Sequence, residues 1–168
     1  MGIAYIYFDY QDQVHQSAVN VFSSVLRQFA QALGEISPAL FSFYRRFCAL
    51  QRTPDLEDLL DCVLAYASRL SSLFLILDAL DACEEYQRSD VLEMLPRLSA
   101  ANIKIFATGR ENLDDLNCFF QSTPTIRIVA DINDIHSFLT TRVNRKLSGY
   151  GNLKGKVVQK LSDQADGV

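Results

Sequence analysis

The sequence predicts an α/β fold, a three-layer sandwich with a mostly parallel sheet between two layers of helices. Short runs of β-branched and aromatic residues alternate along the chain with longer segments whose apolar residues recur every three or four positions. This alternation is typical of strands joined by helical crossovers, which make the strands parallel. The run Leu73–Leu77 agrees, because five consecutive apolar residues need cover on both faces of a sheet.

Four strands are expected in this sheet. Each is a run rich in apolar, β-branched or aromatic residues, which is the composition that strands favour. The expected strands are Ile3–Tyr10, Leu73–Leu77, Asn102–Thr108 and Thr125–Ala130.

Three helices are expected between the first and second strands. The first, Val14–Leu33, carries apolar residues at helical spacing and stops at Gly34, since glycine commonly ends helices. Ser37-Pro38 and Thr53-Pro54 each begin another helix, because serine or threonine caps the first turn and proline suits its first position. These two helices are expected over Ser37–Leu50 and Thr53–Ala67.

Four helices are expected after the second strand. One is capped by Ser89 or Asp90 and bends at Pro96, which cannot donate a backbone hydrogen bond. Another follows the fourth strand and is capped by Asp131 or Asn133. The other expected segments are a short helix over Asn112–Phe120, a loop over Gly149–Gly155 and a terminal helix over Leu153–Ala165.

Composition and charge narrow the class of protein. With 168 residues, 49% hydrophobic and 21% charged, the chain is long and apolar enough for one globular domain over residues 1–168. The net charge of −4 and the pI near 5.1 offer no basic surface for nucleic acid. No apolar run approaches the ~20 residues of a membrane helix, so we expect no membrane partner.

The four cysteines are expected to be buried free thiols. They show no Cys-x-x-Cys spacing and have no neighbouring histidine, so we do not expect them to bind a metal. Free thiols are typical of a reducing compartment, and we therefore expect a cytoplasmic protein. The cysteines are Cys48, Cys62, Cys83 and Cys118.

Two carboxylates follow the second strand. Asp78 comes directly after the apolar run, and Asp81 lies three positions later. The carboxyl ends of parallel strands are where α/β proteins bind ligands, and Mg²⁺ prefers hard oxygen ligands. We therefore expect Asp78 to hold Mg²⁺ through water, and Asp81 to be the catalytic acid that orients the attacking water in nucleotide hydrolysis. The alternative is an ordinary polar turn at a strand end.

A second candidate group, Thr108-Gly109-Arg110, follows the third strand. Parallel strands point the same way, so this group should cluster with Asp78 and Asp81 at one edge of the sheet. A threonine hydroxyl there can contact the attacking water or the γ-phosphate, and an arginine can stabilise phosphoryl charge. We therefore expect Thr108 and Arg110 to bind the nucleotide. The alternative is a turn with a solvated arginine.

The phosphate-binding loop that usually accompanies such a site is missing from the 168 residues. No segment matches G-x-x-x-x-G-K-[ST]. The stretch Gly149–Val157 contains Gly-Lys, but its glycine spacing is wrong, no strand precedes it, and valine replaces the required serine or threonine. The phosphates would lack their backbone cradle and lysine, so we expect the chain alone not to bind nucleotide.

Taken together, these segments resemble the NACHT domain of the STAND class of P-loop NTPases, and most closely its fungal branch with nephrocystin-3-like amino-terminal regions. The Walker B strand of that family corresponds to Leu75–Asp81 and its sensor 1 strand to Ile103–Arg110. The other matching segments are Ala4–Tyr10, Val21–Phe29 and Gln164–Gly167. The chain departs from the family at Ala82, where a glutamate is usual, and it lacks the Walker A strand, loop and helix, so we expect a truncated domain.

The resemblance implies a signalling switch that uses Mg²⁺ with ATP or GTP. In it, Asp78 would order the metal, Asp81 would orient the water, and Thr108 and Arg110 would sense the γ-phosphate. The family's members carry effector and repeat domains on either side, self-associate, and in fungi take part in non-self recognition, a form of innate immunity. Protein partners would therefore act through those flanking domains.

The resemblance also bears on the sheet. The family's strand order, 2-3-1-4-5, would put the missing first strand between Leu73–Leu77 and Asn102–Thr108. Those two strands should either close up and pair directly or leave an apolar crevice between them.

Two functions remain open from the sequence. The first is a nucleotide-binding switch domain, present here as a fragment. The second is a non-catalytic protein-interaction module that keeps the NTPase fold. Whether the chain is an enzyme is therefore undecided at this point.

Overall fold

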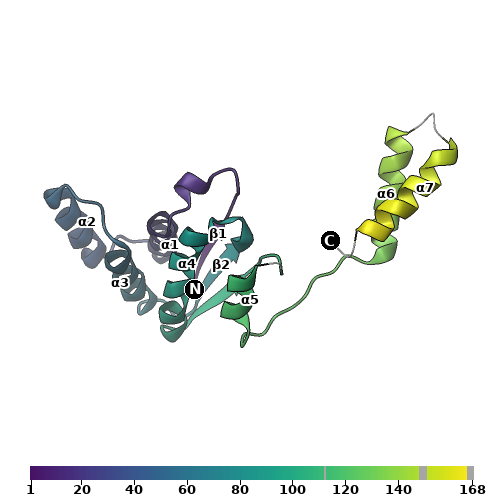
Figure 1. The fold of residues 1–168 in the computed structure, drawn as a ribbon. Coiled ribbons are helices and arrows are strands. Elements are labelled where there is room, and N and C mark those ends of the chain that lie inside the picture. The colour runs from purple at the N-terminus through teal and green to yellow at the C-terminus, as the bar shows by residue number, and fades with distance from the viewer. Residues whose placement is uncertain (112, 148–150, 166–168) are drawn as a thin grey trace. The chain divides into compact units, whose positions relative to one another are not determined.

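The computed structural model describes residues 1–111, 113–147 and 151–165. The chain divides into two compact units, Met1–Ser122 and Thr123–Val168, and each is described by itself (Figure 1). The first unit contains the sheet and five α-helices, and the second contains two helices.

The first unit is built on a three-stranded parallel sheet in the order β1-β2-β3. The strands are β1 (Gly2–Tyr7), β2 (Leu73–Asp78) and β3 (Ile103–Ala107). These match the first three expected strands, and the prediction of an α/β fold with a parallel sheet is confirmed.

β2 and β3 are direct neighbours. Their residues pair from Leu73↔Ile103 to Leu77↔Ala107 without interruption. Paired strands lie only ~4.8 Å apart, so no strand lies between them in this structure. Of the two outcomes expected at this place, the strands have closed up and leave no crevice. A further strand can join this sheet at an outer edge, or between β2 and β3 if these two strands separate.

The prediction of a fourth strand at Thr125–Ala130 is wrong for this structure, because the segment forms no ladder with another strand. Its apolar side chains point into solvent, with Ile126 85% and Ile128 91% exposed. A strand needs a neighbour to satisfy its backbone, and the described residues of the second unit are otherwise helical. A β-branched composition alone therefore does not make this segment a strand.

The helices of the first unit follow the expected order. They are α1 (Ala18–Leu33), α2 (Pro38–Leu50), α3 (Leu56–Ala67), α4 (Glu85–Ala100) and α5 (Asp114–Phe120). α1 begins four residues later than expected, because the Ser17 side chain caps it by accepting from the Asn20 amide. α4 begins before the expected caps, Ser89 and Asp90, and passes through Pro96. Gly34 ends α1 in the left-handed conformation, with φ 77°.

The core lies on one face of the sheet. Helix α1 packs against β1, and its Phe22, Val25 and Phe29 are fully buried. The strand residues buried on this face are Ala4, Leu73, Leu75, Leu77 and Ile103. The side chains on the opposite face that are 45–67% exposed are Ile3, Tyr5, Tyr7 and Phe106. The described elements of the first unit thus bury one face well, and the second helical layer of the expected sandwich is not among them.

A side chain covers the outer edge of β1 at Tyr5. The Tyr5 amide donates to Gln28 Oε1, and Gln28 Nε2 donates to the Tyr5 carbonyl, both at 3.0 Å. The glutamine amide on α1 thus makes the two hydrogen bonds that a neighbouring strand would make.

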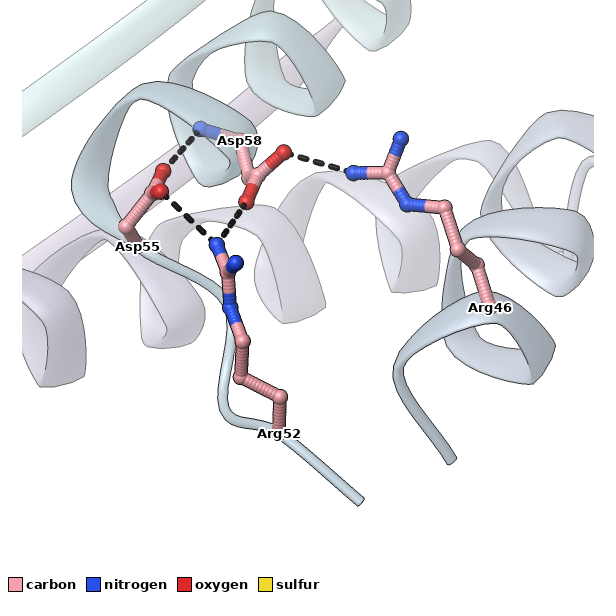
Figure 2. Close-up of polar contacts among 4 residues, drawn as sticks. All are labelled: Arg46, Arg52, Asp55 and Asp58. Carbon is pink, nitrogen blue, oxygen red and sulfur yellow. Dashed lines mark hydrogen bonds and ion pairs between the residues drawn. The ribbon is translucent and has the colours of Figure 1, made fainter. Parts of the chain in front are cut away.

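The junction between α2 and α3 is held by an ionic network (Figure 2). Asp55 caps α3 by accepting from the Asp58 amide at 2.9 Å, and this hydrogen bond lowers the pKa of Asp55. Arg52 contacts both carboxylates, and Arg46 donates to Asp58 at 2.6 Å. The guanidinium of Arg46 also lies 4.6 Å from the ring centroid of Phe47, which joins the network to the apolar side of α2.

The second unit is a pair of helices, α6 (Ile132–Lys146) and α7 (Gly151–Gln164), packed against each other (Figure 1). Asp131, one of the two expected caps, accepts from the Asn133 amide at 2.7 Å. The expected loop over Gly149–Gly155 is wrong from Gly151 onward, where α7 begins. Residues 148–150, and the last two residues of the resembling segment Gln164–Gly167, lie outside the described residues. No helix in the described ranges could cross a bilayer.

We predict that Tyr66→Phe destabilises the first unit by about 1–3 kcal/mol. The Tyr66 hydroxyl accepts a hydrogen bond from the Ser37 amide at 3.0 Å, and both residues are buried. The substitution leaves this amide unsatisfied in the interior. Urea unfolding measures the loss, with Tyr86→Phe as the control because that side chain is 68% exposed. Equal stability of the two variants would contradict this account.

Candidate functional site

The candidate site lies where β2 and β3 end. Asp78 is the last residue of β2, and Thr108 directly follows β3. The Thr108 hydroxyl donates to Asp78 Oδ1 at 2.6 Å and accepts from the Ala79 amide at 2.8 Å. One hydroxyl group therefore joins the two strand ends.

Backbone hydrogen bonds reinforce this junction. The Thr108 amide donates to the Leu77 carbonyl, and the Leu80 amide donates to the Thr108 carbonyl, both at 2.9 Å. Between them the chain turns sharply at Ala79, which has φ 55°. This left-handed conformation is unfavourable for a residue with a side chain, so the surrounding hydrogen bonds hold the turn in place.

The turn brings the second carboxylate back to the same edge. Asp81 lies in a short 3-10 helix, Leu80–Ala82, and its side chain is 16% exposed. Its Oδ2 lies 3.4 Å from Nε of Arg110, whose side chain is 80% exposed. A methyl group added at Gly109 would lie 3.7 Å from the Asp81 amide and 3.2 Å from Leu116. Glycine at position 109 therefore allows the loop after β3 to lie close to the turn that carries Asp81.

The four expected site residues thus meet at one edge of the sheet, as predicted. Their chemical roles stay predictions. One detail differs from the expectation: Thr108 was expected to face an attacking water or a phosphate, and here its only hydroxyl proton goes to Asp78. A phosphate could take that proton only by displacing the carboxylate.

The site fits a metal only in part. Nowhere in the described ranges do three or more His, Cys, Asp or Glu side chains converge as a cation site. Mg²⁺ in nucleotide sites, however, is usually held by one or two carboxylates together with phosphates and water. Asp78 can supply one such carboxylate, and the other ligands would have to come from a nucleotide and solvent.

A buried arginine, not expected from the sequence, supports the site. Arg88 on α4 donates from Nη1 to the Cys83 carbonyl and from Nε to Asp115 Oδ2, both at 2.6 Å. It thereby ties the turn after β2 to α5, which follows the Arg110 loop. Its position at helical spacing from Val91 and Leu92, both buried, is the signal that could have identified it.

The environment of this arginine shifts one carboxyl pKa. Partial burial acts to raise the pKa of Asp115, but hydrogen bonds from Arg88 and from the Leu116 amide outweigh it. The pKa therefore lies below its ordinary value of 3.8.

The cysteines are free, as expected, but only some of them are buried. Cys83 is buried next to the site, and burial raises the pKa of its thiol to about 11. It therefore stays protonated and unreactive at neutral pH. Cys62 is half-buried, and the expectation of burial is wrong for Cys48 and Cys118, which are exposed on α2 and α5.

A separate apolar groove lies away from the strand ends. It has a volume of about 650 Å³ and lies between α1, α2 and α3, where Leu26, Phe43 and Leu59 contribute to its walls. None of the four expected site residues lines it. The candidate site is therefore an exposed edge of the sheet and does not coincide with this groove.

Comparison with known proteins gives one match. The family model described as "Nephrocystin 3, N-terminal" matches residues 1–110. The matched segment runs from the start of the chain to Arg110 and so contains all four candidate site residues. No curated protein and no solved structure is significantly similar to the chain.

We predict that Thr108→Val lowers the free energy of unfolding by roughly 1–3 kcal/mol, because it leaves Asp78 Oδ1 and the Ala79 amide without their shared partner. Thr108→Ser, which keeps the hydroxyl, is the matched control and should retain most of the stability. Chemical denaturation of the three proteins measures the difference. If serine is as damaging as valine, the hydroxyl bridge is not the cause.

The Arg88–Asp115 pair predicts a stability change in acid. Because the folded pKa of Asp115 is lowered, its contribution is present above the ordinary value of 3.8 and is lost as the pH falls through the folded pKa. Asp115→Asn should therefore be less stable than the wild type at pH 6, and the gap should narrow below pH 3.8. The urea concentrations at the unfolding midpoints of the wild type and Asp115→Asn, compared from pH 6 downward, measure this difference in stability. Asp114→Asn, on the same helical turn, is the matched control, because the carboxylate that Arg88 contacts is that of Asp115.

Proposed function

The chain belongs to the nephrocystin 3 N-terminal family, and from this membership and the geometry of the strand ends we propose that it is part of a nucleotide-binding switch domain of the NACHT type. In this proposal, the 168 residues supply the Walker B and sensor 1 portions of a P-loop NTPase of the STAND class. The nucleotide is ATP or GTP with Mg²⁺.

The hydrogen bond between Thr108 and Asp78 is the observation that carries the proposal. It shows that the ends of β2 and β3 are in contact, so one ligand could touch groups from both strands. A carboxylate, a hydroxyl and an arginine at the carboxyl edge of a parallel sheet are suited to a metal-bound phosphate. An ordinary polar turn at one strand end would not require the second strand's hydroxyl.

Each residue has a role that its position supports. Asp78 would contribute a metal ligand, and Asp81 would accept a proton from, and orient, the water that attacks the γ-phosphate. Arg110 is exposed and contacts Asp81 only at 3.4 Å, so it is free to swing toward phosphoryl oxygens. Thr108 would exchange its bond to Asp78 for one to the phosphate or the water. Mg²⁺, when bound, would neutralise charge on the phosphates.

A specific observation favours the second function, a protein-interaction module without catalysis. The 168 residues contain no G-x-x-x-x-G-K-[ST] loop, so nothing in them cradles the phosphates. The aromatic face formed by Tyr5, Tyr7 and Phe106 is also exposed, as at many protein contact sites. We therefore propose that the 168 residues alone act through contacts with other proteins. They would act as part of a nucleotide switch only together with a P-loop.

Calorimetric titration with Mg·ATP tests the proposal. The 168-residue chain should give no saturable heat, and the same chain preceded by a strand, P-loop and helix should bind. In that extended protein, Asp78→Asn should weaken Mg²⁺-dependent binding, because the first carboxylate serves the metal. Asp81→Asn should slow hydrolysis and leave binding nearly unchanged, because the second serves the water.

Two results would contradict this assignment. Equal loss of binding in both variants would show that Asp78 and Asp81 do not have the separate roles of metal ligand and water-orienting acid. Saturable binding by the 168-residue chain, unaffected by Asp78→Asn, would place the nucleotide elsewhere.

A further inference from the structure

The apolar groove between α1, α2 and α3 has walls that are held in place by hydrogen bonds. α1 and α3 pack directly against each other. α2 is tied to α3 near both of its ends: the Ser37 amide donates to the Tyr66 hydroxyl at 3.0 Å, and Arg46 donates to Asp58 at 2.6 Å (Figure 2). The volume of about 650 Å³ lies within the range of roughly 300–1,000 Å³ that is typical of small-molecule sites.

Most of the groove lining is apolar. Leu26 on α1 and Leu59 on α3 are buried beneath it. Leu40 and Phe43 contribute the wall that α2 supplies, and Ile36 extends this wall before α2 begins. A ligand in the groove would therefore lose apolar surface from water against aliphatic and aromatic side chains.

Helix α1 adds a row of hydrogen-bond donors beside the apolar lining. Ser23, Arg27 and Gln31 all line the groove, and their spacing of four residues puts them on one face of the helix. Leu26 and Ala30 form the neighbouring apolar row. The donor row extends about 12 Å along the helix axis, so apolar surface and donors run side by side over this length.

Arg27 gives the groove an uncompensated positive charge. The other charged residue of the lining is Glu35, which pairs with Arg69. In the part of the chain that the structure describes, no ion pair or hydrogen bond joins the Arg27 side chain to another residue. Arg27 also borders the hollow beside β1 that contains Asp9 and Asp12, and it pairs with neither of these carboxylates. A free arginine is suited to bind a carboxylate through two parallel hydrogen bonds.

We propose that this groove binds a fatty acid, with the carboxylate on Arg27 and the aliphatic chain against Leu26, Leu59 and the wall from α2. One free cation beside apolar walls matches a ligand that has one anionic group and no other polar group. Ser23 and Gln31 lie one helical turn to either side of Arg27 and offer further donors to the carboxylate. The groove is separate from the strand ends, so this inference does not rest on nucleotide binding.

Calorimetric titration of the 168-residue chain with decanoate tests the site, at concentrations below those at which decanoate forms micelles. The wild type should bind decanoate saturably. Arg27→Gln should weaken this binding about tenfold or more, because it removes charge-assisted hydrogen bonds, and should leave the binding of decanol nearly unchanged. Arg45→Gln makes the same change in charge on an exposed residue of α2 outside the groove. It is the matched control and should bind decanoate like the wild type.

The position of the aliphatic chain is tested separately. Decanoate should shift the backbone amide NMR signals of Leu26, Leu40 and Leu59 and leave those of the aromatic face unchanged. Ile36→Gln should weaken the binding of decanoate and decanol alike, since Ile36 lines the groove. This side chain is 71% exposed, so the substitution spares the fold.

Three results would overturn the proposal. The first is a wild type that binds no decanoate saturably, which would leave the groove as a contact surface for protein. The second is an Arg27→Gln variant that binds decanoate as tightly as the wild type. The third is a set of shifted NMR signals confined to the aromatic face.

Discussion

The Thr108 hydroxyl bridge is the interaction on which the candidate site depends. It contacts the carboxylate that ends β2 and the first amide of the turn that follows it, while the Thr108 backbone bonds to both sides of that turn. The position of Asp81 is set by this turn, and Arg110 follows Thr108 by two residues. The bridge can form only because β2 and β3 are adjacent, parallel and in register at Leu77↔Ala107. Strand pairing thereby determines the chemistry available at the edge.

The sequence predicted the elements that local rules specify. Apolar runs and capping residues gave β1 to β3 and most of the helix boundaries, and the parallel direction of the strands was enough to bring Asp78 and Thr108 together. The strand expected at Thr125–Ala130 was wrong, and the sequence left open whether β2 and β3 pair directly. Both depend on which strand lies beside which, and pairing between distant segments leaves no local signal. Arg88 was missed because its partners, Cys83 and Asp115, lie in different segments.

The two edges and two faces of the sheet show how unequally its surfaces are covered. Helix α1 supplies both the core side chains Phe22, Val25 and Phe29 and the Gln28 amide that covers the β1 edge. One helix thus buries a face with its apolar side chains and covers an edge at one residue, Tyr5, with a polar side chain. The β3 edge and the aromatic face receive no such cover from the described elements of the first unit. The surfaces of the sheet that remain open for contacts are therefore adjacent.

The backbone at Ala79 is strained. A left-handed conformation costs a non-glycine residue about 1–2 kcal/mol, so other interactions must hold the turn in this conformation. The amide of this residue is bonded to the Thr108 hydroxyl. A ligand that draws that hydroxyl away would remove one restraint on the turn that positions Asp81 and would leave the backbone hydrogen bonds of Thr108 to Leu77 and Leu80. The strained turn is therefore held by the Thr108 hydroxyl together with two backbone hydrogen bonds, and a glycine at position 79 would remove the strain.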